Sequence, residues 1–170
     1  MEKKIIIPTI IILFILIIAG TTCYQNQSDD NTYISFTATS LNGECYYYTY
    51  DIASDQLTEV YKYSDYSQYP LGIVDKQTSS VYFMYRINRG DQLMKYDFQE
   101  KKLSQLTDDL YAVNQILSVE DKLYLIGSSF EHPKLSLIEY DLKTSNYEIL
   151  TPISDVVRQM TYDKRNNRIL

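Results

Sequence analysis

The 170-residue sequence has no Trp, five Gly, four Pro and a single His. With so little Gly, it contains neither the Gly-x-Ser-x-Gly turn that presents a nucleophile nor a Gly-rich loop that could cradle a phosphate. A Ser-His-Asp mechanism would have to use His132, which we place in a hairpin loop before Pro133. We therefore interpret His132 as a surface loop residue and find no local pattern of a hydrolase or nucleotide-binding enzyme.

Cysteine is also scarce, with only Cys23 and Cys45. A disulfide scaffold or a structural zinc site needs more ligands at closer spacing, although a single bridge between the two cysteines stays open. The adjacent acids at 29–30 and 108–109 lack the spaced oxygen ligands of a calcium loop. We predict no metal and no cofactor.

Basic residues are too few to balance the acidic ones. The chain has 16 Lys and Arg against 22 Asp and Glu, a formal net charge of −6, and no run of basic residues. A negatively charged domain is repelled by phosphate backbones. Nucleic acid is therefore excluded as an expected partner.

The N-terminal segment, in contrast, has an almost unbroken apolar run. Residues 5–19 read IIIPTIIILFILIIA and follow Lys3 and Lys4. A helix over 5–22 would be about 27 Å long, close to the ~30 Å hydrocarbon core of a bilayer. The preceding lysines favour a cytoplasmic N-terminus and export of the remainder. We predict that 1–22 is a signal or membrane anchor and that the rest lies on the extracytoplasmic side of the cell membrane.

Three fates of this segment remain open: an uncleaved transmembrane anchor, a cleaved secretory signal, or a lipoprotein signal. The run AGTTC, ending at Cys23, resembles the bacterial lipoprotein pattern of an apolar stretch, small residues and a Cys at the mature N-terminus. This resemblance makes Cys23 a candidate lipid-attachment site. The polar residues 23–31 that follow are interpreted as a spacer. All three fates give the same topology.

Beyond the spacer the chain repeats itself. The dipeptide Tyr-Asp recurs at 50–51, 96–97 and 140–141, at a period of about 45 residues. Each pair ends an alternating segment and precedes a polar turn and a second strand-like segment. We expect each Asp to accept hydrogen bonds from the backbone of its turn rather than to bind a metal.

Alternation and turn residues predict a succession of short strands and no helix after the spacer. The expected strands are 32–39, 44–52 and 56–63; then 71–75, 80–87, 91–98 and 102–107; then 112–119, 122–129, 134–142 and 146–151; and finally 156–162 and 168–170. Four antiparallel strands in a unit of about 45 residues are typical of a β-propeller blade. The predicted fold class is all-β, with about three four-stranded antiparallel blades of an incomplete β-propeller and an N-terminal transmembrane or signal helix.

Two segments carry a family resemblance. YDLKTSNYEILT (140–151) and YDKRNNRIL (162–170) resemble the two halves of TolB-type propeller repeats, and the resemblance covers 32–170. It implies that 32–170 forms partial propeller repeats. Because propellers close with about four to eight blades, we expect this chain to be a fragment of a longer protein. Self-association that completes a ring and a compact stack of three sheets are the alternatives.

Tyrosine is the most distinctive residue of the sequence, with 18 copies. Tyr46, Tyr48 and Tyr50 project from one face of a predicted strand and Tyr47 from the other, and we expect packing within or between sheets. A second group falls at a strand end and in a loop, where exposed aromatic rings often contact ligands. This candidate ligand surface consists of Tyr61, Tyr63, Tyr66 and Tyr69.

These observations favour a non-enzymatic, extracytoplasmic, propeller-type binding module tethered to a bacterial cell membrane. Its partners would be the membrane, through the N-terminal segment, and a protein, peptide or glycan at the loops. The alternative is the N-terminal part of a secreted enzyme of peptidase or lyase type, since propellers resembling these gate peptidases or form lyase sites. The catalytic part would then lie beyond Leu170.

Overall fold

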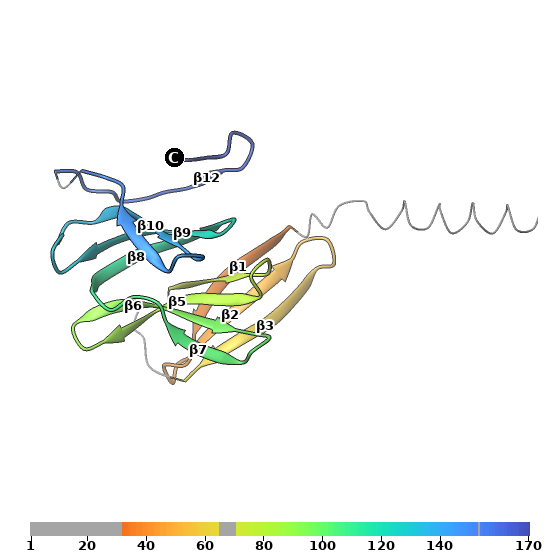
Figure 1. Ribbon diagram of the computed structural model, residues 1–170. Helices are drawn as coiled ribbons and strands as arrows, with labels where there is room; N and C mark the ends of the chain where they lie inside the picture. Colours follow the sequence, from red (N-terminus) through yellow and green to blue (C-terminus); the bar gives the residue numbers. More distant parts are fainter. Residues whose placement is uncertain (1–31, 65–70, 153) are drawn as a thin grey trace, which may run out of the picture. The chain divides into compact units, whose positions relative to one another are not determined.

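A computed structural model describes residues 32–64, 71–152 and 154–170; the predicted anchor and spacer, with Cys23, lie outside this part. Every regular element in the described ranges is a strand (Figure 1). Within the same ranges there is no helix of the length and apolarity needed to cross a membrane. The all-β prediction is confirmed.

The strands form three antiparallel sheets and a short hairpin, in chain order. Sheet 1 has the order β1-β2-β3, sheet 2 the order β4-β5-β6-β7, and sheet 3 the order β8-β9-β10-β11. Their bounds are β1 Tyr33–Thr39, β2 Cys45–Asp51, β3 Gln56–Tyr63, β4 Gly72–Asp75, β5 Ser80–Ile87, β6 Gly90–Asp97, β7 Lys102–Gln105, β8 Leu110–Val119, β9 Lys122–Ser129, β10 Ser136–Asp141 and β11 Asn146–Ile149. The hairpin consists of β12 Tyr162–Asp163 and β13 Arg168–Ile169.

The Tyr-Asp repeat predicted from the sequence marks the same strand in each sheet. Its tyrosines lie opposite equivalent residues of the next strand, in the pairs Tyr50 with Leu57, Tyr96 with Leu103, and Tyr140 with Tyr147. The period of about 45 residues therefore corresponds to one sheet.

The aspartates of the repeat act as turn acceptors, as expected. Asp97 Oδ1 accepts hydrogen bonds from the backbone N–H groups of Gln99 and Glu100 at 2.9 and 3.0 Å, and Asp141 does the same in sheet 3. Asp51 accepts a bond from the N–H of Ser54. These contacts stabilise the turn that joins the last two strands of each of the three sheets.

Each sheet buries an apolar face against its neighbour in the chain. Alternation along β5 directs Val81 and Phe83 toward sheet 1, where they pack with Tyr47, and directs Tyr82 and Met84 toward sheet 3. Sheet 2 is thus covered on both faces, which is the arrangement of consecutive propeller blades.

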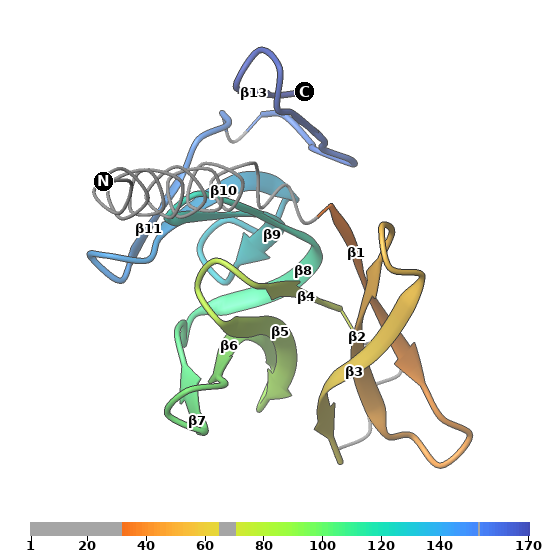
Figure 2. The same ribbon diagram turned by 90° about the vertical axis from the view of Figure 1, so that its right-hand side faces the viewer.

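Side-chain hydrogen bonds join the first strand of each sheet to that of the next. Ser35 Oγ of β1 accepts a bond from the N–H of Val74 in β4 at 2.7 Å. Ser118 of β8 donates to Asp75 Oδ2 of β4 at 2.8 Å. Figure 2 shows β4 lying beside β8. These bonds link successive sheets along one side.

The predicted strand bounds agree with the structure to within two residues, with one exception. The strand predicted at 156–162 is wrong for 156–161, since only Tyr162–Asp163 is a strand there. The backbone N–H and C=O of Met160 are bonded by the side-chain amide of Gln115 at 3.0 and 2.8 Å, so they are not available to a neighbouring strand. The hairpin register also pairs Thr161 with Leu170, so earlier residues lie past the end of the partner strand.

Candidate functional site

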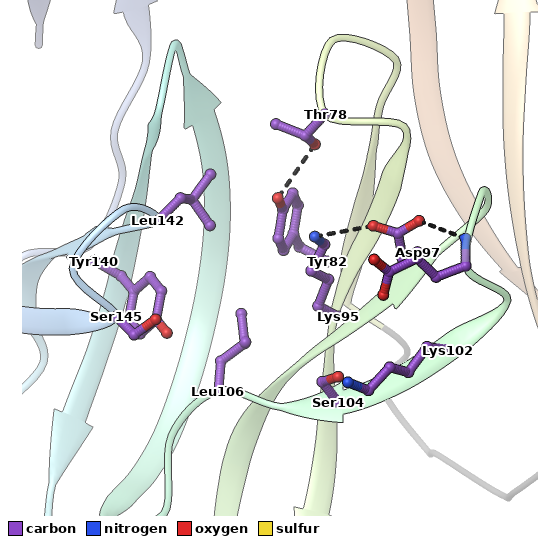
Figure 3. Close-up of a pocket in the computed structure, with 11 residues that line it drawn as sticks. Thr78, Tyr82, Lys95, Asp97, Lys102, Ser104, Leu106, Tyr140, Leu142 and Ser145 are labelled. Carbon is purple, nitrogen blue, oxygen red and sulfur yellow. Dashed lines mark hydrogen bonds and ion pairs between the residues drawn. The ribbon is translucent and has the colours of Figure 1, made fainter.

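Sheets 2 and 3 leave a crevice of about 350 Å³ between them at the end of the sheets that carries the aspartate turns (Figure 3). Its volume is near the lower limit of the roughly 300–1,000 Å³ of small-molecule sites. Sheet 2 contributes side chains from β5, β6, β7 and the turn before β5, and sheet 3 contributes β10 and the turn after it. We call this space the sheet 2–sheet 3 crevice.

Two buried tyrosines from opposite walls line the crevice (Figure 3). Tyr82 of β5 is 1% exposed and Tyr140 of β10 is 2% exposed. The Tyr82 hydroxyl donates to Thr78 Oγ1 at 3.2 Å. The Tyr140 hydroxyl, in contrast, has no hydrogen-bond partner among the residues that the structure describes. No buried side-chain nitrogen or oxygen of the described residues lacks a partner, so the Tyr140 hydroxyl is accessible from the crevice, where it can bond a ligand or a water molecule.

The charged residues of the crevice balance one another. Lys95 Nζ pairs with Asp97 Oδ2 at 3.1 Å. Hydrogen bonds from the Glu100 N–H and from Lys95 lower the pKa of Asp97, so Asp97 is ionised at neutral pH. Lys102 and Glu100 also line the crevice and form no ion pair with any described residue. The lining therefore contains two lysines and two acidic residues.

The remaining lining combines small hydroxyl groups with apolar surface. Ser104 and Ser145 contribute hydroxyls from the two sheets, and Leu106 and Leu142 contribute aliphatic side chains. The crevice is lined by neither His nor Cys, and no group of metal-ligating side chains is found in residues 32–64, 71–152 and 154–170. This chemistry is suited to binding a small polar group.

A second cavity of about 440 Å³ lies at the opposite end of β5, where the turn to β6 meets the loop after β9. It is lined by Arg89, Asp108 and the ring of Phe130, among others. The Phe130 ring is 54% exposed and contacts that of Tyr111 edge-on, with 5.6 Å between the centroids. His132 lies in the same loop, where its N–H donates to Ser129 Oγ, in agreement with the loop position predicted for it.

The predicted ligand surface includes two tyrosines that the structure places between sheets 1 and 2. Tyr61 stacks on Tyr96 with 4.0 Å between ring centroids, and Tyr63 meets Tyr85 edge-on at 5.2 Å. Both are half-buried, and burial raises the pKa of Tyr61 to about 12. Tyr66 and Tyr69 lie outside the described residues. A ligand role for these four tyrosines stays a prediction.

The tyrosines of β2 divide between two faces, as alternation predicted. Tyr47 is 1% exposed and packs into the interface with sheet 2. Tyr46 and Tyr48 lie on the other face, where Tyr48 stacks on Phe36 of β1 at 5.4 Å. The expected packing within and between sheets is confirmed.

Sequence reasoning did not single out the residues of the crevice. Tyr82 and Tyr140 come from different repeats and share no motif, and Lys102 belongs to an ordinary polar turn and strand. Tyr140 belongs to the repeated Tyr-Asp pair, but its counterpart Tyr96 instead packs against Tyr61. Only the packing of sheet 3 on sheet 2 brings these residues together.

The sheets define the class of fold, an incomplete β-propeller of blade-like antiparallel sheets. The solved structures that match include TolB from Acinetobacter baumannii, with 23% sequence identity and a TM-score of 0.56. The match covers 74% of this chain and 31% of the TolB chain, so the chain spans less than a third of that protein. The fold is TolB-like. No protein-family model and no curated protein matches the sequence.

Proposed function

We propose that this chain is a non-enzymatic, extracytoplasmic binding module tethered to a bacterial cell membrane. The observation that carries the binding role is Tyr140, a residue only 2% exposed whose hydroxyl is accessible from the sheet 2–sheet 3 crevice and bonds none of the described residues. A propeller scaffold holds such a group rigidly because the sheets on either side pack through a continuous core. The ligand is a protein, a peptide or a glycan.

The proposed location at the membrane rests on the N-terminal sequence. The apolar run 5–19 follows Lys3 and Lys4, which favours retention of the N-terminus in the cytoplasm. We propose that 1–22 is the anchor or signal, that 23–31 is a spacer, and that Cys23 is the lipid-attachment residue if the segment is a lipoprotein signal. The TolB-like fold of the region after the spacer is compatible with this arrangement.

Topology is tested with the full chain carrying a C-terminal epitope in bacterial cells. We expect the epitope in the membrane fraction and its loss when protease is added to intact spheroplasts, while a cytoplasmic marker remains intact. An epitope that is protected until the cells are lysed would contradict export. An exported epitope in the soluble fraction would instead identify a cleaved secretory signal.

Lipidation is tested separately by labelling with a clickable palmitate. The Cys23→Ala variant should lose the label, and Cys45→Ala serves as the matched control because Cys45 is buried in sheet 1. Equal labelling of wild type and Cys23→Ala would exclude lipid at Cys23. The membrane fractionation of the epitope-tagged chain would then be the test of an uncleaved transmembrane anchor.

A further inference from the structure

We propose that the sheet 2–sheet 3 crevice binds a neutral saccharide unit. This inference rests on the proposed binding function and specifies the class of ligand for the same site. It follows from three properties of the lining: hydrogen-bonding groups of both kinds, a balanced charge, and an apolar surface beside the polar one.

The first property is the alternation of donors and acceptors. Lys95 and Lys102 can only donate hydrogen bonds, and the carboxylates of Asp97 and Glu100 can only accept them. The hydroxyl of Tyr140 can do both. A sugar hydroxyl is also donor and acceptor at once, so neighbouring hydroxyls of one ring can accept from an ammonium group and donate to a carboxylate. A ligand with acceptors alone would leave the Glu100 carboxylate unused, because Asp97 already accepts bonds from its turn and pairs with Lys95.

The second property is the absence of net charge in the lining. Lys95 is paired with Asp97, and the two further charged residues, Lys102 and Glu100, have opposite signs. A net anion is attracted by the two lysines but repelled by the two carboxylates. A net cation is attracted by the carboxylates but repelled by the lysines. A neutral ligand also avoids the desolvation cost that a charged group bears on entering a partly enclosed site.

The third property is the apolar surface that adjoins these groups. Leu106 and Leu142 line the crevice from sheets 2 and 3, together with the two tyrosines (Figure 3). Saccharide rings present C–H groups on their faces and hydroxyls on their rims. The combination of aliphatic walls with a few placed polar groups fixes the orientation of such a ring.

The test uses the full chain in lipid nanodiscs, because sugar-based detergents would compete for the site. Glucose, galactose and N-acetylglucosamine are the neutral probes, and glucuronate is the matched probe that adds a carboxylate to the same ring. Protein-observed NMR should show that a neutral sugar shifts the amides of Ser104, Tyr140 and Leu142. Glucuronate should bind no more tightly than glucose.

Two variants assign the binding to the crevice. Tyr140→Phe keeps the ring in the core and removes only the hydroxyl, so we expect about two- to tenfold weaker sugar binding with the fold retained. Tyr162→Phe is the matched control, because the Tyr162 hydroxyl bonds Asn167 on the hairpin, away from the crevice lining. Lys102→Met should also weaken binding, whereas Lys62→Met, on sheet 1, should not.

Three results would overturn the inference: no neutral sugar shifts the crevice amides, the shifts map elsewhere, or glucuronate binds more than tenfold tighter than glucose. If these occur in a chain that is exported and binds another ligand, the proposed function stands and only the saccharide assignment falls. If the chain is retained in the cytoplasm, or converts the sugar it binds, the proposed function itself is wrong.

Discussion

Gly72 of β4 lies directly against the ring of Tyr47 of β2, and a Cβ at Gly72 would be 2.5 Å from Tyr47 Cε1. The same Cβ would be 2.8 Å from Cβ of Phe83 and 2.9 Å from the carbonyl oxygen of Tyr82. Tyr47 belongs to sheet 1, whereas Gly72 and Phe83 belong to sheet 2. The missing side chain of Gly72 therefore sets how closely the two sheets approach.

Gly72→Ala should lower the free energy of unfolding by about 1–3 kcal/mol, the usual cost of overpacking a core. The chain lacks Trp, so urea unfolding can be followed by tyrosine fluorescence. Thr58→Ala, at an exposed position of β3, is the control and should change stability by less than about 1 kcal/mol. In a double-mutant cycle, Tyr47→Ala should remove only the part of the cost of Gly72→Ala that comes from the Tyr47 ring, because the contacts with Phe83 Cβ and the Tyr82 carbonyl remain. Additive effects would show that Tyr47 and Gly72 do not clash in the variant.

A second prediction concerns Gln92, a buried residue of β6. Its Nε2 donates to the carbonyl of Leu110 at 2.8 Å, and its Oε1 accepts from Thr107 Oγ1 at 3.1 Å and from the Leu110 N–H at 3.3 Å. Gln92 thereby fixes the start of β8 against sheet 2. Gln92→Leu would fill similar space but leave these groups without a partner.

We expect Gln92→Leu to destabilise the fold by about 1–3 kcal/mol for the unsatisfied groups that it leaves. The same urea experiment measures it, with Gln99→Leu in an exposed turn as the control. In Gln92→Leu, hydrogen exchange of the Leu110 amide should be faster than in the wild type, and this increase should be larger than for amides in sheet 1. Equal stability of the Gln92 and Gln99 variants would rule out an anchoring role for Gln92.

The positions of the strands were predictable from the sequence because each repeat carries the same local chemistry. Alternation gives the strands, and a Tyr-Asp pair followed by a polar turn gives the hairpin. The conformation of 156–161 was not predictable from the sequence, because its pattern resembles a strand. In the structure, the side-chain amide of Gln115 forms hydrogen bonds with the backbone N–H and C=O of Met160. The partners of this segment, Gln115 for Met160 and the carbonyl of Leu135 for the N–H of Val157, lie far away in the sequence.

The placement of side chains between sheets was harder to predict. The register between β2 and β3 shifts between Tyr47 and Tyr48, so that Tyr61 lies opposite Tyr47 and Glu59 opposite Tyr48. This bulge directs Tyr61 into the interface with sheet 2, whereas simple alternation cannot locate it. The crevice is harder still, since Tyr82 and Tyr140 come together only through the packing of two sheets.

A third prediction is loss of stability in acid. Hydrogen bonds from their turns hold the pKa values of Asp51, Asp97, Asp141 and Asp163 below the ordinary value. The folded state therefore binds protons more weakly than the unfolded state, so these groups stabilise the fold above pH ~3.9. That contribution is lost as the pH falls through the lower pKa of the folded state.

The melting temperature should thus fall as the pH is lowered from about 6 toward 2. The double variant Asp97→Asn/Asp141→Asn keeps oxygen acceptors in both turns but cannot titrate, so its melting temperature should depend less on pH in this range. Asp155→Asn, on an exposed loop, is the control and should leave the pH dependence of the melting temperature unchanged. An unchanged pH dependence in the double variant would assign acid sensitivity to other groups.

The last prediction concerns Tyr61 in alkali. Burial against Tyr96 and Tyr63 raises the pKa of Tyr61 to about 12, chiefly because its charged form would lose hydration. A raised pKa in the folded state stabilises the fold below the unfolded pKa of about 10, and this contribution disappears as the pH rises through about 12. Burial also raises the pKa values of Tyr47 and Tyr147, so absorbance titration should show several late-ionising phenolates in the folded chain that are absent in denaturant. Tyr61→Phe should remove one of these late-ionising groups and make stability less sensitive to pH between about 10 and 12. If the variant keeps all the late-ionising groups, they belong to other tyrosines, and burial between sheets 1 and 2 does not control the ionisation of Tyr61.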